Sequence, residues 1–103
     1  MSKLVRDNIP EIIRQNGGVP DYRIASDDSE FQQALDLKLD EEIIELRSAS
    51  DPENTAEEIA DIIEVLFTIA KGHGYDPEQI EVIRLKKRVE RGGFEKRIIL
   101  EKW

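Results

Sequence analysis

Apolar residues recur at helical spacing over two long stretches of the chain. With residues set about 100° apart, Leu35, Leu39 and Leu46 fall on one face of the stretch 30–48. The stretch 55–71 carries a wider apolar face, which is formed by Ile59, Ile62, Ile63, Leu66, Ile69 and Ala70. Such patterns are typical of amphipathic helices that bury one face. We therefore expect two long helices, over residues 30–48 and 55–71.

Capping residues predict two further helices. Asp76 to Gln79 combine an N-cap aspartate, a proline in the first turn and a glutamine that can complete a capping box. A third long helix should start there and continue to about Arg91. A short helix is expected over residues 9–16, between Asn8 as a candidate N-cap and the glycine at Gly17.

Two short segments look extended rather than helical. They cover residues 19–25 and 94–101, and they could pair into a small β ribbon. The connections between the predicted helices are short, which favours antiparallel neighbours. We expect an all-α fold of one domain, residues 1–103: a compact antiparallel bundle with short β segments near its ends, completed by oligomerisation.

Composition narrows the classes of function. The chain has 103 residues, a net charge of −8 and no cysteine, so disulfides and thiolate metal sites are excluded. The acidic balance argues against nucleic-acid binding, because the phosphate backbone would be repelled. No apolar run approaches the ~20 residues of a membrane span, and the start MSKLVRDNIP lacks the apolar stretch of a secretory signal. We expect a cytoplasmic protein.

Four acids stand on or beside the apolar faces of the two long helices. Glu42 lies inside the apolar arc of the first helix, and Glu45 lies at its edge one turn later. Glu58 and Asp61 repeat this arrangement on the second helix. Residues three apart are neighbours on a helix surface. Packing the two apolar faces together would bring four carboxylates into one small volume.

Buried carboxylates repel one another and require neutralisation. A hard divalent cation with oxygen ligands supplies it, and Mg²⁺ is the usual choice where a substrate phosphate completes the coordination shell. The alternative is that these acids form part of a solvated surface. Salt bridges to Lys38 or Arg47 could also neutralise part of the set without a metal.

Basic residues gather on the third long helix. Arg84, Lys87 and Arg91 share one face, where they would suit the oxygens of a triphosphate. A solvated helix face that favours the helix dipole is the alternative. A smaller charged group near the N-terminus consists of Lys3, Arg6 and Asp7, and the pattern assigns no role to it.

The acid motif resembles that of a known family. The run Glu41-Glu42-Ile43-Ile44-Glu45 is followed by twelve residues and then by Glu58-Ile59-Ala60-Asp61. This is similar to the EExxE…ExxD signature of the MazG-like, all-α nucleoside triphosphate pyrophosphohydrolases. The segments LVRDNIPEII and KKRVERGGFEKRIIL also resemble a subgroup labelled phosphoribosyl-ATP pyrophosphohydrolase-like.

The resemblance implies a homodimer or homotetramer that hydrolyses a nucleoside triphosphate to the monophosphate and pyrophosphate. It implies Mg²⁺, with Mn²⁺ as an alternative. The matching ligands are Glu42, Glu45, Glu58 and Asp61. The first acid of the signature is Glu41, for which a role in orienting ligands or water is implied; either Glu41 or Glu45 could accept the proton of the attacking water. The phosphate contacts correspond to Lys38, Arg84, Lys87 and Arg91.

Two departures bear on the substrate. Enzymes of histidine synthesis tend to have a glycine before the paired acids, where this chain has Asp40, and an aromatic-His pair soon after ExxD, whereas residues 62–68 contain no histidine. A house-cleaning role, removing a non-standard or surplus nucleotide, therefore fits better. The alternatives are a phosphoribosyl-ATP pyrophosphohydrolase and a non-catalytic helical module that binds a nucleotide or a protein.

Overall fold

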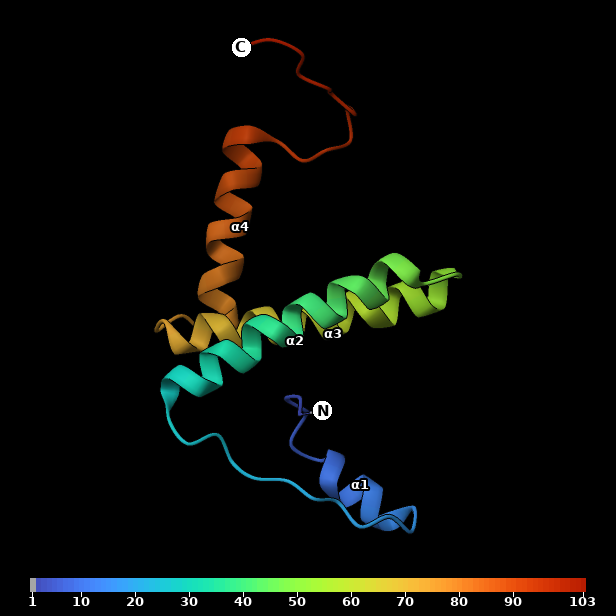
Figure 1. Ribbon diagram of the computed structural model, residues 1–103. Helices are drawn as coiled ribbons and strands as arrows, with labels where there is room; N and C mark the ends of the chain where they lie inside the picture. The colour runs from blue at the N-terminus through green and yellow to red at the C-terminus, as the bar shows by residue number, and fades with distance from the viewer. Residues whose placement is uncertain (1) are drawn as a thin grey trace. The chain divides into compact units, whose positions relative to one another are not determined.

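The computed structural model describes residues 2–103, which form four helices and no strand (Figure 1). The helices are α1 (Ile9–Gln15), α2 (Asp28–Ser48), α3 (Pro52–Gly72) and α4 (Pro77–Arg91). The expected all-α class is confirmed. The chain divides into two compact units, the first ending at Ile69 and the second running from Ala70 to Trp103. Within the described part, no helix is long and apolar enough to cross a bilayer.

Aspartate caps set where the two long helices of the first unit begin. The Asp27 side chain accepts a hydrogen bond from the Glu30 amide at 2.8 Å, so α2 starts two residues before the predicted position. Asp51 Oδ1 accepts from the Asn54 amide at 2.7 Å and α3 starts at Pro52, three residues early. Such caps satisfy amide groups that the helix itself leaves free.

The second unit contains the last turn of α3, then α4 and the C-terminal segment. The predicted capping box is confirmed, because Asp76 and Gln79 exchange hydrogen bonds at 2.8 and 2.9 Å. Helix α4 ends at Gly92, whose φ of 86° is a conformation that side-chain-bearing residues rarely adopt. No residue of α4 is buried, and its apolar positions Val82 and Val89 are exposed.

The predicted β ribbon is wrong. Residues 19–25 and 94–101 contain no strand. In the first segment Pro20 lacks the amide hydrogen that a strand ladder needs. In the second, the Arg97 amide donates to the Phe94 carbonyl at 3.1 Å, and Arg97 has a φ of 56°. This turn interrupts the extended run that the apolar spacing suggested.

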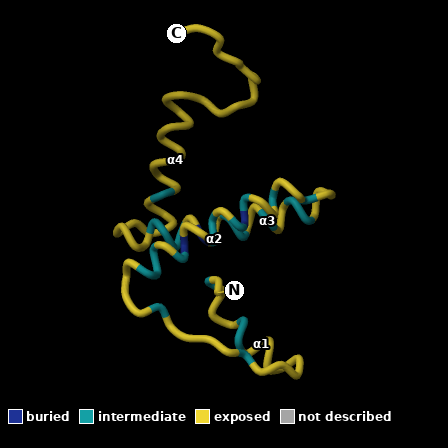
Figure 2. Tube along the Cα trace, in the orientation of Figure 1, coloured by how far each residue is buried: buried dark blue, intermediate teal, exposed yellow. Residues whose placement is uncertain are grey.

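Helices α2 and α3 lie side by side and provide the packed interior of the first unit (Figure 2). Leu35 on α2 and Val65 on α3 are buried, with 2% and 8% of their surface exposed. Much of the wide apolar face of α3 is open, since Ile59, Ile63 and Leu66 are exposed. The buried residue that stands out is Glu42, a carboxylate only 6% exposed.

Candidate metal centre

Three carboxylates from α2 and α3 meet in one place. Glu42, Glu58 and Asp61 each offer an oxygen, and these oxygens all lie within 4.8 Å of one another. Glu42 is buried and the other two are half-buried. The helical spacing on α3 places Glu58 and Asp61 one turn apart on one face, opposite Glu42 on α2. The structure therefore brings together three of the four predicted ligands.

Two carboxylate oxygens of this cluster are buried, and no hydrogen bond within residues 2–103 replaces the solvent that they lose. Glu42 Oε2 and Glu58 Oε2 are buried and have no hydrogen-bond partner among residues 2–103. A buried acceptor without a partner typically destabilises a fold by about 1–3 kcal/mol, and more when it is charged. Such groups are few in native structures, and a bound ion or an ordered water commonly satisfies them. These two oxygens mark the position where a cation would be stabilised most.

Glu58 shows the electrostatic consequence. Loss of solvent around its carboxyl raises its pKa, and the neighbouring Glu45 adds to the increase through a hydrogen bond and its charge. The charges of Asp61 and Glu42 act in the same direction, so the pKa of Glu58 rises from 4.5 to about 7. A divalent cation would reverse the balance, because it favours the ionised form.

Glu45, the fourth predicted ligand, lies outside the set of three. It is exposed on α2, although its carboxyl is close enough to Glu58 to hydrogen-bond with it. It therefore borders the cluster on its solvent side. This position agrees with its location at the edge of the apolar arc.

Glu41 is held by two lysines. Lys3 Nζ lies 3.2 Å from Glu41 Oε1, and Lys38 Nζ lies 3.2 Å from Glu41 Oε2. These bonds, first the one from Lys3, lower the pKa of Glu41. With both oxygens engaged, Glu41 is better suited to position the lysines than to accept a proton.

Lys38 is the cation nearest the buried carboxylate. Its Nζ lies 3.3 Å from Glu42 Oε1, one helical turn along α2, and the side chain is largely buried. Burial disfavours the charged form of Lys38, but its bonds to Glu41 and Glu42 outweigh burial and raise its pKa. Lys38 thus neutralises one oxygen of Glu42 and leaves Oε2 free for another ligand.

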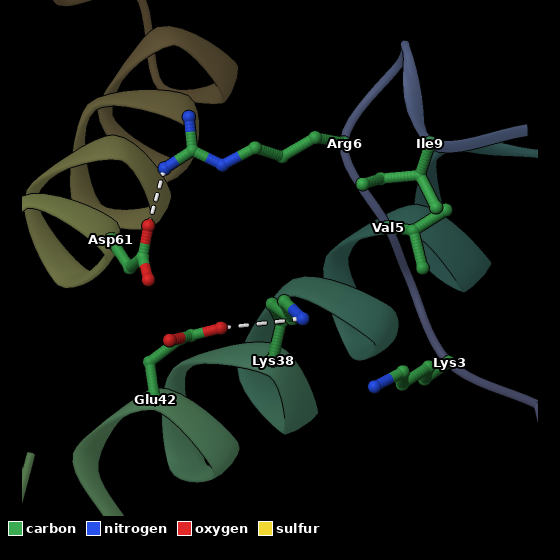
Figure 3. A pocket seen from close by; sticks show the side chains of 7 residues that line it. All are labelled: Lys3, Val5, Arg6, Ile9, Lys38, Glu42 and Asp61. Atoms are coloured by element: carbon green, nitrogen blue, oxygen red, sulfur yellow. Dashed lines mark hydrogen bonds and ion pairs between the residues drawn. The ribbon is translucent and has the colours of Figure 1, made fainter. Parts of the chain in front are cut away.

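The N-terminal segment supplies two more cations that sequence reasoning did not assign. Arg6 Nη2 donates to Asp61 Oδ1 at 2.7 Å (Figure 3). Lys3 bonds Glu41 as described. These contacts join residues 55 and 38 positions apart. Helical periodicity carries no information about an irregular segment, so the only available signal was the charge itself.

A pocket of about 250 Å³ opens between these groups (Figure 3). Cations line it from the N-terminal segment and α2, and carboxylates line it from α2 and α3. The lining residues are Lys3, Val5, Arg6, Ile9, Lys38, Glu42 and Asp61. Glu42 and Asp61 of the carboxylate cluster thus line a pocket that also contains three cationic side chains.

The predicted basic face of α4 belongs to the second unit. Arg84, Lys87 and Arg91 are exposed there. Arg84 is engaged by Glu81 on the same helix, through Nε at 2.8 Å and through Nη2. A role for these three residues in substrate binding stays a prediction.

The donor set fits a hard divalent cation. All three groups offer carboxylate oxygen, which Mg²⁺, Mn²⁺ and Ca²⁺ prefer. Oxygens on opposite sides of a Mg²⁺ ion lie about 4.2 Å apart, slightly less than the limit of 4.8 Å in the cluster. Three ligands would leave coordination positions for water or a phosphate.

Comparison with known proteins gives one partial match. A protein of Mycolicibacterium smegmatis, itself described as uncharacterized, is 59% identical over 49 residues. The match covers 48% of this chain and 49% of that protein, so it spans about half the length of each. No protein family description matches the chain, and no solved structure matches it.

Proposed function

We propose that this protein is a Mg²⁺-dependent nucleotide pyrophosphohydrolase with a MazG-like helical bundle. The observation that carries the proposal is the pair of buried, unpartnered oxygens on facing helices, Glu42 Oε2 and Glu58 Oε2. Together with Asp61 they form a carboxylate site in which a divalent cation would relieve the mutual repulsion. Mn²⁺ has the same ligand preference and is the alternative metal.

Each residue of the cluster has a role in this proposal. Glu42, Glu58 and Asp61 hold the metal, which when bound polarises phosphate oxygens and lowers the pKa of water. Glu45 borders the cluster from the solvent side, so it can complete the shell or accept a proton from the attacking water. Lys38 lies beside Glu42 and offers its ammonium group to the phosphate chain.

The choice of substrate depends on the resemblance of the acid motif to the MazG-like enzymes. On that basis the substrate is a nucleoside triphosphate, and cleavage between the α and β phosphates gives the monophosphate and pyrophosphate. The departures at Asp40 and at residues 62–68 favour a house-cleaning enzyme of the cytoplasm over one of histidine synthesis.

Self-association is part of the same proposal. The first unit buries few apolar side chains, while Ile59, Ile63 and Leu66 of α3 are exposed. Isolated chains of this size gain marginal stability from their cores. A second copy packed on this face would bury them, and a homodimer or homotetramer follows. Sedimentation equilibrium with Ile63→Asp against the unchanged protein tests this, because a charge at such an interface should shift the protein toward monomer.

The decisive experiment is a product analysis. The protein is incubated with Mg²⁺ and a panel of ribo-, deoxyribo- and damaged nucleoside triphosphates, together with phosphoribosyl-ATP. Monophosphate plus pyrophosphate is the expected result. Diphosphate plus phosphate would require cleavage between the β and γ phosphates and would contradict the proposal. Turnover of phosphoribosyl-ATP alone would select the histidine-synthesis alternative.

Two variants connect activity to the cluster. Glu42→Gln and Asp61→Asn keep the shape of the side chain and remove a ligand charge, so Mg²⁺-dependent turnover should fall by on the order of 10²–10³-fold. Glu64→Gln on the exposed side of α3 is the matched control and should keep full activity. Full activity in either cluster variant would remove this site from consideration. If the unchanged protein cleaves no nucleotide and Mg²⁺ does not raise its thermal midpoint, a non-catalytic helical module is the better description.

A further inference from the structure

The N-terminal segment lines the pocket beside the carboxylate cluster without being part of the acid motif. Lys3 and Arg6 reach α2 and α3 from this segment, and Val5 and Ile9 line the same pocket. Lys38 from α2 is the third cation that lines this pocket, and the carboxylates of Glu42 and Asp61 line it as well. In a chain of net charge −8, such a concentration of positive charge requires an explanation.

We propose that this pocket binds the polyphosphate chain of the substrate and that Arg6 and Lys3 are its binding residues. Each exchanges a carboxylate partner for a phosphate oxygen when the metal and substrate enter. The inference rests on the proposed function in one respect: the anion is the phosphate chain of a nucleotide. It assigns a ligand to a segment whose role the sequence pattern left open.

The size of the pocket favours a phosphate chain over a whole nucleotide. Its volume is about 250 Å³, whereas pockets that enclose a drug-sized molecule typically have about 300–1,000 Å³. The polar groups that line it are cations and carboxylates. This size and lining suit the phosphate chain of a nucleotide better than the whole molecule.

The contacts of Arg6 would allow it to exchange the Asp61 carboxylate for a phosphate oxygen. Among residues 2–103 its side chain makes one hydrogen bond, Nη2 to Asp61 Oδ1 at 2.7 Å, and more than half of the side chain is exposed. The rest of its donor fork is therefore available, and a guanidinium can bind phosphate through two parallel hydrogen bonds. When a metal takes the Asp61 carboxylate, the attraction between Asp61 and Arg6 weakens. The incoming phosphate then becomes the stronger partner.

Lys3 forms an ion pair with Glu41, as Arg6 does with Asp61. Its ammonium group lies 3.2 Å from Glu41 Oε1 and is well exposed. Glu41 keeps a second cation, Lys38, at 3.2 Å from its other oxygen. Release of Lys3 to a phosphate would therefore leave Glu41 with the Lys38 ammonium, which it shares with Glu42. Because Lys3 is a point charge on a flexible chain, its contribution should be smaller than that of Arg6.

The test uses inorganic tripolyphosphate, which has the phosphate chain without the nucleoside. Its affinity is measured by calorimetry in the presence of Mg²⁺, for the unchanged protein, Arg6→Gln and Lys3→Gln. We expect Arg6→Gln to weaken binding about tenfold to a hundredfold, the loss typical of a charge-assisted hydrogen bond. Lys3→Gln should weaken it less. Arg6→Lys keeps the charge without the fork and should fall between Arg6→Gln and the unchanged protein.

Arg14→Gln is the matched control. Arg14 is also a half-exposed arginine of the N-terminal region, paired with Glu11 at 3.2 Å, and it does not line the pocket. It should leave the affinity for tripolyphosphate unchanged. An Arg6→Gln affinity equal to that of the control would overturn the inference. Tighter binding in Arg6→Gln would overturn it too, because Arg6 would then act as a competitor of the ligand.

Binding of Mg²⁺ alone separates this inference from the proposed function. Arg6→Gln should bind Mg²⁺ as tightly as the unchanged protein or tighter, since it removes a competitor for Asp61. If nucleotides are hydrolysed normally by Arg6→Gln, the inference fails while the proposed function stands. If no nucleotide is hydrolysed but tripolyphosphate binding depends on Arg6, the proposed function fails and the anion site stands.

Discussion

The α2–α3 pair and helix α4 are both rich in charged residues but differ in how the charges are compensated. On α4 two arginines find acidic partners locally: Arg84 bonds Glu81 three residues away, and Arg88 bonds Glu95 just beyond the helix. All of these groups are exposed. Between α2 and α3, Glu42 and Glu58 each keep a buried oxygen without a partner in the described chain.

This difference teaches which charges indicate a site. An exposed pair satisfied by a near neighbour contributes little to stability and needs no ligand. A buried carboxylate oxygen without a partner is costly in the free protein, and a ligand can recover that cost. Charged residues are denser on α4 than on the α2–α3 pair, so burial and missing partners, and not the density of charge, are the informative properties.

The largest expected effect concerns the packed interior that only the first region has. Leu35→Ala should lower the free energy of unfolding by about 2–5 kcal/mol, because Leu35 is 2% exposed. Val89→Ala on α4 should change it by less than about 0.5 kcal/mol, because Val89 is exposed. Urea denaturation measures both. An equal loss at Val89 would show that α4 is buried in the assembled protein.

The next effect tests the lysine that compensates Glu42. Lys38→Met keeps most of the apolar stem and removes the charge, which leaves Glu42 Oε1 without the ammonium 3.3 Å away. We expect a loss of about 1–3 kcal/mol in urea denaturation without metal, and a smaller loss with Mg²⁺. Lys86→Met on α4 is the matched change at an exposed position and should have little effect. A Lys38→Met protein as stable as the unchanged one would mean that water, and not Lys38, compensates Glu42.

A third prediction is a gain in thermal stability, whereas the first two are losses. Glu58→Gln removes one of several repelling carboxylates, so the metal-free protein should melt a few degrees higher than the unchanged protein. Mg²⁺ should then add little to its thermal midpoint, whereas it should raise that of the unchanged protein clearly. Glu57→Gln, at the neighbouring exposed position, should retain the response to Mg²⁺. Scanning calorimetry with Mg²⁺ and with a chelator measures both quantities.

The smallest effect concerns an ion pair at the start of α2. Like the pairs of α4, it joins two residues that are close in the sequence. Glu30 accepts from Arg23 at 2.6 and 2.8 Å and from the Ser26 amide at 2.8 Å. The bond from Arg23, followed by that from Ser26, lowers the pKa of Glu30 from 4.5 to about 2.

Because the folded pKa lies below the unfolded one, ionised Glu30 stabilises the protein above pH 4.5, and this contribution is lost as the pH falls toward 2. Glu30→Gln should therefore melt slightly lower than the unchanged protein at pH 7, and the two curves should converge near pH 2. Glu95→Gln, which removes the partner of Arg88, should behave alike. A difference that persists unchanged to pH 2 would contradict the assignment.

Much of the helical framework could be predicted from the sequence, because local rules determine it. The capping box at Asp76 and Gln79 depends only on residues three apart, and it was confirmed. The burial of Glu42 followed from its place within an apolar arc. The β segments were wrong because apolar spacing alone cannot supply a strand with a pairing partner, and Pro20 and the turn before Arg97 act against one.

The arrangement of the site could be predicted only in part. Helical spacing indicated that Glu58 and Asp61 share a face, and packing of apolar faces placed them near Glu42. The same reasoning did not separate Glu45, which lies outside the cluster, from the three residues inside it. A position at the edge of an apolar arc does not specify how far the carboxylate lies from the facing helix. Arg6 and Lys3 could not be placed at all, since their contacts depend on the path of an irregular segment.

The contact between Arg6 and Asp61 also has a consequence for how the chain folds. It joins residues 55 positions apart, so a long loop must close before it can form. Helices α2 and α3 are joined by a short link and can pair early, whereas the N-terminal segment gains nothing by docking until both are in place. Docking of Lys3 and Arg6 on the two helices should therefore be a late event in folding. Hydrogen exchange should show the amides of the N-terminal segment opening before those of α2 and α3.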